Sequence, residues 1–349
     1  MILKSRIFTL TVLLAIAAMT PAVLKAQDAQ PMNEVPLGSG STTTSTKTGG
    51  TASGAAASDG TVTSVDGSPA TVEPPAPASS AGPEAIAFDG TYVWIATQFS
   101  DSVTRVRVSD GAVAGTFPVG KRPVALLYAA GYIWVANLLS DNVMRLTPST
   151  GAIAGTFATG DGPGGFAFDG TNVWVANREG NSVTKLRAST GANLGSFASG
   201  GNRPMGLAFA ANSIWVANNF SNSVARLSAA GAVLATYPTD KGPFGVAAQG
   251  ENVWVTNYFG KTLTKLRAVD GFNLGTFKVG DGASGIAFDG TNLWVVNNGD
   301  STVMKITPAT GAIVTTYATG KGPFSIAFDG AKVWVPNFAS NSVSTTAAN

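Results

Sequence analysis

The chain contains no histidine and no cysteine among its 349 residues. The lack of cysteine excludes disulfide bonds, so the stability of the fold has to come from packing. The lack of histidine removes the side chain that most often acts as a general acid or base near neutral pH. No phosphate loop, nucleophile motif or metal motif replaces them. We therefore predict a protein that is not an enzyme, with no catalytic residue, no metal site and no cofactor.

Charge is also scarce in this sequence. Only 12% of the residues are charged, and the formal net charge is +2. Three of the 22 basic residues, Lys4, Arg6 and Lys25, lie in a segment that we expect to be removed, which leaves 19 basic against 20 acidic residues. The mature chain then has a net charge of −1 and no basic stripe that could neutralise a phosphate backbone. Nucleic acid is excluded as a partner.

No apolar run is long enough for a comfortable transmembrane helix. Lys4 and Arg6 precede an apolar run over residues 7–19, a pattern typical of a secretory signal peptide, to which we assign residues 1–26. Residues 27–60 are rich in Ser, Thr, Gly and Ala and poor in large apolar side chains, so we interpret them as a disordered linker. The sequence thus predicts export to the periplasm or the extracellular space, without membrane insertion after signal cleavage. The alternative is that the apolar run is retained as an uncleaved anchor.

Tryptophan, in contrast, occurs once in each of seven similar segments. Neighbouring tryptophans are 39 to 41 residues apart, at Trp94, Trp134, Trp174, Trp215, Trp254, Trp294 and Trp334. A period of about 40 residues is typical of repeat folds, whose units bury their faces against one another.

Each copy of the repeat predicts four short antiparallel strands. In the third copy we expect them over residues 165–168, 172–177, 182–186 and 193–197. The first two flank Asp169-Gly170, a strong hairpin signal. The strand around Trp174 is apolar at consecutive positions, which indicates burial on both faces. Four strands in about 40 residues match one propeller blade, so the sequence predicts an all-β, seven-bladed β-propeller of four-stranded antiparallel blades.

The seventh copy ends at Asn349 before a fourth strand. An unpaired third strand would leave open backbone groups at the closure of the ring. We predict that an N-terminal strand completes this blade, with residues 61–81 as closing strand and lead-in and residues 70–73 as the outer strand itself. The propeller domain would then span residues 61–349, with the repeats over residues 82–349.

Several motifs point to a known family. The segments Val253-Trp254-Val255-Thr256-Asn257 and Gly242-Pro243-Phe244-Gly245-Val246 resemble the YVTN-type β-propeller repeat, although tryptophan stands where that family usually has tyrosine. The Gly-Pro, Asp-Gly and Trp-Val pairs also resemble the propeller of streptogramin lyases. The cleavage chemistry of those enzymes relies on histidines and a metal, so this chain, without histidine, is not expected to share it.

Residues that every copy shares are interpreted as structural, because ring symmetry accounts for them. We expect the seven tryptophans to pack between neighbouring sheets. A basic residue of the third strand should bond a carboxylate or carbonyl of the next blade, for example in its Asp-Gly turn, from Arg105, Arg145, Lys185, Arg226, Lys265 and Lys305. An asparagine ends most tryptophan strands and should cap the loop or, alternatively, face a ligand, at Asn137, Asn177, Asn218, Asn257, Asn297 and Asn337.

Function is expected where the copies differ. The loop after the tryptophan strand and the loop that joins consecutive blades should lie on one face of the ring. Their aromatic and charged residues are our candidates for a binding face, namely Phe99, Arg122, Arg178, Glu179, Arg203, Phe220, Tyr258, Phe259 and Phe338. This composition is typical of a recognition surface, and the alternative is scattered surface residues without a role. The blade-entry glycines Gly165, Gly206, Gly245 and Gly285 should leave room in the central channel.

The favoured hypothesis is an exported, monomeric, non-enzymatic scaffold that binds a protein, peptide or glycan through this loop face. The alternative is a metal-dependent lyase or lactonase-like enzyme of the cell envelope. Its ligands would be the strand-end asparagines and the few carboxylates of the same face, Asp161, Glu179, Asp281 and Asp300.

Overall fold

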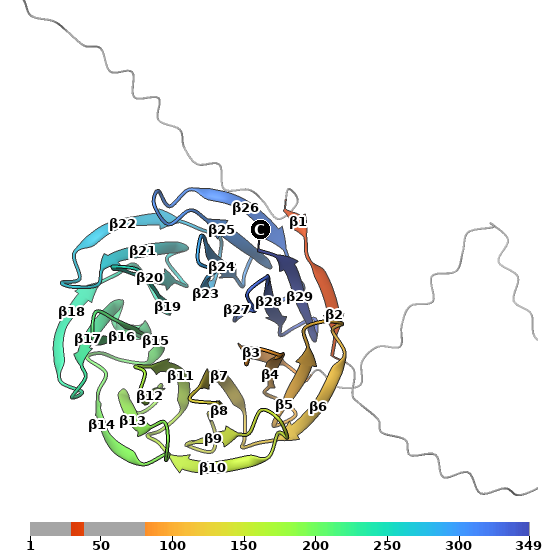
Figure 1. The fold of residues 1–349 in the computed structure, drawn as a ribbon. Coiled ribbons are helices and arrows are strands. Elements are labelled where there is room, and N and C mark those ends of the chain that lie inside the picture. The colour runs from red at the N-terminus through yellow and green to blue at the C-terminus, as the bar shows by residue number, and fades with distance from the viewer. Residues whose placement is uncertain (1–28, 38–80, 349) are drawn as a thin grey trace, which may run out of the picture.

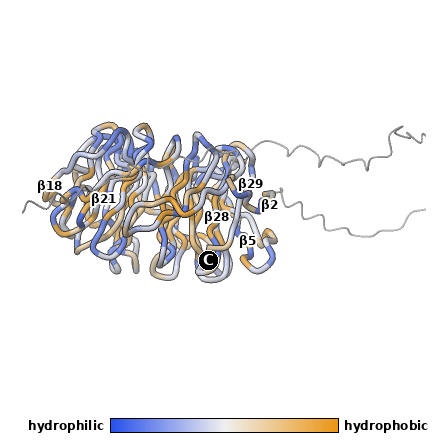
Figure 2. Tube along the Cα trace, turned by 90° about the horizontal axis from the view of Figure 1, so that it is seen from above, coloured by the Kyte–Doolittle hydropathy of each residue, from blue (hydrophilic) through white to orange (hydrophobic). Residues whose placement is uncertain are grey.

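Seven β-sheets stand around a central axis in the computed structural model, which describes residues 29–37 and 81–348 (Figure 1). Seen from the side, the ring is a thick disc in which apolar segments such as β28 lie inside (Figure 2). The architecture is the predicted seven-bladed β-propeller. No helix in the described part of the chain is long and apolar enough to cross a membrane.

The blades follow one another along the chain, and each runs from the channel to the rim. Blade one comprises β3 (Pro83–Phe88), β4 (Tyr92–Thr97), β5 (Ser102–Arg107) and β6 (Val113–Pro118). Blade two comprises β7 (Pro123–Ala129), β8 (Tyr132–Asn137), β9 (Asn142–Leu146) and β10 (Ile153–Ala158). Blade three comprises β11 (Pro163–Phe168), β12 (Asn172–Asn177), β13 (Ser182–Arg187) and β14 (Asn193–Ala198).

The other half of the ring repeats this order. Blade four comprises β15 (Pro204–Ala210), β16 (Ser213–Asn218), a short 3-10 turn η2 (Asn219–Ser221), β17 (Ser223–Ser228) and β18 (Val233–Pro238). Blade five comprises β19 (Pro243–Gln249), β20 (Asn252–Asn257), β21 (Thr262–Arg267) and β22 (Asn273–Lys278). Blade six contains β23 (Ala283–Phe288), β24 (Leu293–Asn297), β25 (Thr302–Ile306) and β26 (Ile313–Ala318). Blade seven contains β27 (Ala327–Phe328), β28 (Lys332–Asn337) and β29 (Ser342–Ala347).

The tryptophan strand is the most buried strand of each blade. In blade three every residue of β12 is buried, whereas the outer strand β14 alternates between exposed and half-buried residues. Trp174 is completely buried and contributes to a cluster that includes Leu207 and Ile214 of the next blade. Its ring also lies 6.0 Å from that of Phe197 on its own outer strand. The tryptophans therefore fill the space between neighbouring sheets.

The basic residue of the third strand makes the expected bond to the next blade. Arg145 Nη1 donates to the carbonyl oxygen of Ala188 at 3.0 Å, and Lys265 Nζ donates to that of Pro308 at 2.9 Å. The acceptors lie in the turn between the third and fourth strands, so the expectation that the Asp-Gly turn supplies them is wrong. Five of the six cations also lie over the tryptophan of their own blade, as Lys185 Nζ does at 4.8 Å from the ring of Trp174.

The aspartate of the Asp-Gly turn instead anchors the tryptophan. Asp289 Oδ1 accepts the backbone N–H groups of Thr291 and Asn292, and Oδ2 accepts the indole N–H of Trp294 at 2.6 Å. Asp89, Asp169 and Asp329 bond their tryptophans in the same way. Blades four and five lack the aspartate, and the indole N–H groups of Trp215 and Trp254 find no partner within residues 29–37 and 81–348. A buried unpaired donor costs stability.

The ring closes through a segment far upstream of the repeats. The strand β2 (Asn33–Pro36) pairs antiparallel with β29 and becomes the fourth strand of blade seven, so an N-terminal strand completes the last blade as predicted. The location of that strand was predicted wrongly. The outer position is occupied by residues 33–36, which lie inside the predicted linker, whereas the proposed strand at residues 70–73 lies outside the described residues.

The same segment also crosses to the preceding blade. The two-residue strand β1 (Gln30–Pro31) pairs in parallel with β26 and gives blade six a fifth strand at the rim (Figure 1). Met32 is buried between blades six and seven beside Ile326, and Leu37 is buried between blades seven and one beside Val93. Apolar burial by this short segment therefore holds together three consecutive blades where the chain ends meet.

We expect Leu37→Ala to lower the free energy of unfolding by about 2 kcal/mol, because it removes buried apolar volume at the closure. The matched control is Asn33→Ala in the same segment, whose exposed side chain should contribute less than about 0.5 kcal/mol. Urea unfolding followed by tryptophan fluorescence measures both. Equal values for the two variants would contradict closure by this segment.

A second prediction concerns the tryptophan anchor. Asp289→Ala should destabilise the protein by about 2 kcal/mol, since it leaves the buried indole N–H of Trp294 unpaired. Gln249→Asp restores the Asp-Gly turn of blade five and should stabilise it by about 1 kcal/mol, because Trp254 gains an acceptor. Thermal melts test both predictions: the melting temperature should fall below that of the wild type for Asp289→Ala and rise above it for Gln249→Asp.

The contribution of Asp289 should depend on pH. Burial alone would raise the pKa of Asp289, but the hydrogen bonds from Asn292, Trp294 and Thr291 outweigh burial and lower it below 3.8. Its contribution to stability is therefore complete above about pH 4 and is lost as the pH falls through the lowered value. The difference in stability between the wild type and Asp289→Ala should shrink as the pH falls. A difference that stays the same at low pH would contradict this role of the Asp289 carboxylate.

Candidate functional site

The two variable loops of each blade meet on one face of the ring, as expected. The N–H of Leu138 donates to the carbonyl of Arg122 at 2.9 Å, and the N–H of Tyr258 donates to that of Gly242 at 2.8 Å. Equivalent bonds join the loops of the other blades. We call this side the loop face and define it by the segments that follow the tryptophan strands, residues 98–101, 138–141, 178–181, 219–222, 258–261, 298–301 and 338–341, with the blade-joining segments bonded to them.

The predicted binding-face residues separate into two groups on the loop face. The first lies on blades three and four, where Arg203 stacks on Phe220 at 4.8 Å and its guanidinium is 4.0 Å from the carboxylate of Glu179. The second lies on blades five, seven and one and contains Tyr258, Phe259, Phe338 and Phe99. Arg122 lies beside this group and donates from Nε to Gln98 at 2.7 Å.

A continuous run of six aromatic rings connects the second group to the channel. Phe259 contacts Tyr258 at 5.2 Å between ring centroids, and Tyr258 contacts Phe244 at 5.8 Å. The run continues through Phe324, Phe338 and Phe99 with centroid distances of 6.4, 6.2 and 5.3 Å. These spacings are in the range of favourable aromatic pairs. We call these six residues the aromatic run, and its ends, Phe259 and Phe99, are 62% and 61% exposed.

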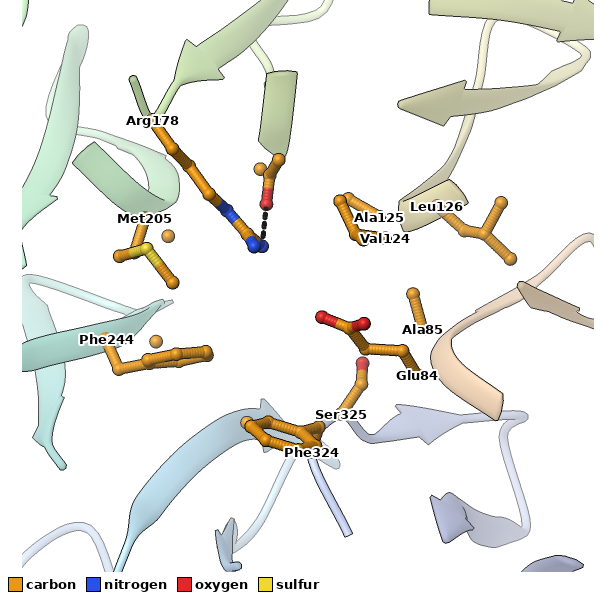
Figure 3. A pocket seen from close by; sticks show the side chains of 15 residues that line it. Glu84, Ala85, Val124, Ala125, Leu126, Arg178, Met205, Phe244, Phe324 and Ser325 are labelled. Carbon is orange, nitrogen blue, oxygen red and sulfur yellow. Dashed lines mark hydrogen bonds between the residues drawn. The ribbon is translucent and has the colours of Figure 1, made fainter. Parts of the chain in front are cut away.

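Phe244 of the first strand β19 and Phe324, which precedes β27, point into a cavity at the channel mouth (Figure 3). The cavity has a volume of about 140 Å³. Its wall is formed largely by the residue that follows the proline at the entry of a blade, at Glu84, Val124, Gly164, Met205, Phe244 and Phe324. The sixth copy has the buried Ser284 at this position, which allows the rings of blades five and seven to meet across blade six.

These positions were not among the candidate site residues predicted from the sequence. A backbone irregularity follows the proline that begins most first strands, for example between Pro163 and Gly165, and it turns the intervening residue towards the channel. The signal that could have identified these positions is their variation between copies, since the prolines before them and the small residues after them are shared.

The blade-entry glycines have a second role besides the one expected. A Cβ atom on Gly165 would lie 2.0 Å from the carbonyl oxygen of Met205, and one on Gly245 would lie 2.4 Å from that of Ser284. These glycines permit close approach of neighbouring first strands. All four also line the cavity, which agrees with the expectation that they leave room in the channel.

Arg178 lies in the cavity rather than on the outer surface of the loop face. Its side chain reaches inwards from blade three, and Nη2 donates to the carbonyl of Gly164 at 2.7 Å (Figure 3). A Cβ atom on Gly164 would be 2.0 Å from Arg178 Nε, so this course of the arginine requires glycine there. The Nε of Arg178 is buried and has no hydrogen-bond partner among the residues that the structure describes.

Glu84 points into the same cavity from the other side (Figure 3). Burial raises the pKa of Glu84, and the positive charges of Arg178 and Arg122 oppose this shift only in part. Burial likewise lowers the pKa of Arg178, and the carboxylate of Glu84 opposes that shift. No ion pair joins the two side chains in the described parts of the chain. The cavity thus holds two opposite, poorly solvated charges that are separated from each other.

The strand-end asparagines are turned towards the third strand of their own blade. Asn177 Nδ2 donates to Ser182 Oγ and to Thr184 Oγ1, both at 2.9 Å. Five of the six have a glycine packed directly against the amide, as Gly160 is against Asn177. Asn257, Asn297 and Asn337 also donate to side-chain hydroxyls. Asn218 Nδ2 instead donates to the backbone carbonyl of Ser199 at 3.1 Å, and Asn297 Oδ1 accepts the backbone N–H of Gly280 at 3.1 Å, so the expected bonding to backbone holds for these two.

The carboxylates named for the alternative function have other contacts. Asp281 forms an ion pair with Lys261 at 2.8 Å, and Asp300 Oδ2 accepts the backbone N–H of Asp281 at 2.7 Å. Glu179 lies beside Arg203, and Asp161 is exposed. Over residues 29–37 and 81–348, no three acidic side chains gather closely enough to hold a metal ion.

The chain was compared with known proteins at the level of families, sequences and structures. No protein-family model and no curated protein matches it, so the resemblance to the YVTN-type repeat is not confirmed by a family model. Solved structures do match. The hydrazine synthase of Kuenenia stuttgartiensis has a TM-score of 0.70 at 19% identity, over 81% of this chain and 99% of that chain.

Virginiamycin B lyase from Staphylococcus aureus has a TM-score of 0.68 at 18% identity, over 77% of this chain and 96% of that one. A catalytically inactive form of that lyase with quinupristin has the same TM-score and identity, over 77% and 95% of the two chains. The likeness to a streptogramin lyase propeller thus holds for the fold. Identities below 20% carry no conclusion about activity.

Replacing Glu84 with glutamine should stabilise the protein at neutral pH. Because the pKa of Glu84 is raised in the folded state, its contribution to stability is complete below the ordinary value of 4.5 and is lost as the pH rises through the raised value. Glutamine has the same shape without the charge. Thermal melts should coincide near pH 4 and separate towards about pH 8, with Glu84→Gln melting higher.

The exposed Glu179→Gln is the matched control and should show no such separation. A lower melting temperature for Glu84→Gln at about pH 8 would contradict desolvation as the dominant effect on this carboxylate.

Proposed function

We propose that the protein is a binding propeller that docks a protein, peptide or glycan on its loop face, across the aromatic run. The main support for this proposal is the aromatic run. Its six rings are in contact from blade five through blade seven to blade one, and the rings at both ends are exposed. Isolated exposed rings are common on protein surfaces, but a connected set that leads into a cavity is typical of a recognition site.

The surroundings of the aromatic run support docking. Arg122 lies beside Phe99 on the neighbouring loop, and Lys121 of the same loop forms an exposed ion pair with Asp101 at 2.7 Å. Aromatic side chains with arginine at their border are enriched at the centres of interfaces, because they bury a large area with few rotatable bonds. Polar residues that remain hydrated around these side chains determine the orientation of a bound partner more than its affinity.

Export is part of this proposal. The N-terminal pattern of Lys4, Arg6 and the apolar run over residues 7–19 supports secretion to the periplasm or the extracellular space. A propeller in such a compartment would meet its partner outside the cytoplasm.

A pull-down from cell-envelope extract tests the docking surface. The variant Phe99→Ser with Phe259→Ser removes both exposed ends of the aromatic run and should reduce capture at least about tenfold, since hot-spot rings contribute about 2 kcal/mol each. The matched control is Val269→Ser with Phe272→Ser. These residues are 62% and 61% exposed, but lie in the turn before β22 at the opposite face.

The control should capture the same material as the wild type. Glycosidase treatment of the extract and competition by tryptic peptides then distinguish a glycan from a protein or peptide partner. Equal capture by the wild type and both variants would contradict the loop face as the docking surface.

A further inference from the structure

We propose that the channel mouth binds a small zwitterion, a molecule of the size of one free amino acid that carries a cationic group, an anionic group and an apolar body. Glu84 would hold the cationic group, Arg178 the anionic group, and Phe244, Phe324 and Met205 the apolar part. This site lies within the loop face but does not depend on the docking of a larger partner.

The separation of the two charges is the first argument. Glu84 and Arg178 point into the same cavity from opposite sides, and no ion pair among the described residues joins them (Figure 3). Arg178 uses Nη2 for the carbonyl of Gly164, while its buried Nε has no partner within the described chain. Both side chains are half-buried, and charges with reduced solvation are normally paired, because an unpaired one costs stability. A ligand with both charges would satisfy both side chains at once.

The position of Arg178 is the second argument. In the other six copies the residue after the strand-end position is Gln98, Leu138, Asn219, Tyr258, Asn298 or Phe338, so blade three alone has a cation here. Blade three is also the copy with glycine at the cavity position, where a Cβ atom on Gly164 would collide with the arginine. Two departures from the repeat thus combine to place one guanidinium in the cavity. Ring symmetry explains neither of them.

The apolar wall and the volume are the third argument. Phe244 and Phe324 lie 6.4 Å apart between ring centroids, and together with Met205 they form one side of the cavity (Figure 3). The volume of about 140 Å³ is close to that of the engineered apolar cavity that binds benzene. It suits a single aliphatic or aromatic side chain and is too small for a drug-sized ligand.

Binding should also be linked to proton release. Burial raises the pKa of Glu84 in the free protein, and an ammonium group beside it would lower this pKa again. Arg122, whose charge also faces Glu84, and Arg178 would remain cationic throughout. The affinity should therefore increase as the pH rises through the pKa of Glu84, and the ammonium should lose its partner at lower pH.

Isothermal titration calorimetry with L-leucine and L-phenylalanine tests the proposal on the wild-type propeller. N-acetyl-L-leucine lacks the cationic group, and L-leucinamide lacks the anionic one. Each blocked probe should bind at least about tenfold more weakly than L-leucine, because each loses a charge-assisted hydrogen bond. Glu84→Gln should weaken binding of L-leucine but not of N-acetyl-L-leucine, and Arg178→Gln should weaken binding of L-leucine but not of L-leucinamide.

Phe99→Ser is the matched control outside the cavity and should bind L-leucine like the wild type. Melting temperatures establish that the variants are folded, and the blocked probes test the wild type without any substitution. No detectable binding of either amino acid, or equal binding of the free and blocked forms, would overturn the proposal. Either result would leave the docking surface untouched, since that is tested with other residues and another ligand.

Discussion

The burial of one tryptophan between each pair of neighbouring sheets is the constraint on which the ring depends. Trp174 fills the space between blades three and four, its indole N–H is held by Asp169, and Lys185 lies over its ring while bonding the next blade. One residue thus sets the distance between sheets, and its two polar neighbours set its orientation and tie the blades together. Repetition of this unit gives the ring its curvature.

The departures from the repeat are informative because the shared unit leaves them unexplained. Blades four and five lack the turn aspartate, and their indole N–H groups are unpaired in the described structure. At the junction of blades seven and one, Thr345 replaces the bridging cation, and the apolar side chains of Val35 and Leu37 pack there instead. In both cases the interface between neighbouring blades keeps its other contacts. The stability of a blade interface is therefore distributed over several interactions, and one of them can be replaced.

The channel mouth departs furthest from symmetry. Its six lining positions carry a carboxylate, two aliphatic or thioether side chains, two phenylalanines and a glycine that accommodates Arg178. A ring held together at its blade interfaces tolerates such variation, because these side chains face an open channel rather than a packed core. The cost is visible in the desolvated charges of Glu84 and Arg178, which destabilise the fold and are typical of a functional site.

Local sequence patterns were sufficient to predict the blades and the face on which their loops meet. The period of 39 to 41 residues, the Asp-Gly turns and the continuous apolar strands each report on contacts within one repeat or between adjacent ones. The loop face follows directly, since strand direction alternates within a blade. Phe99 and Phe259 could therefore be proposed as surface residues from the sequence, although their contact with Phe244 and Phe324 could not.

The sequence by itself determined the number of blades, their strands and the need for a closing strand, because these follow from periodicity and from the pairing of backbone groups. Only the tertiary structure decided which segment closes the ring and which residues meet in the channel. Residues 33–36 are separated from β29 by nearly the whole chain, and no local pattern encodes a contact at that distance. Likewise, Glu84 and Arg178 face each other only because seven blades bend the chain into a circle and bring their first strands to one axis.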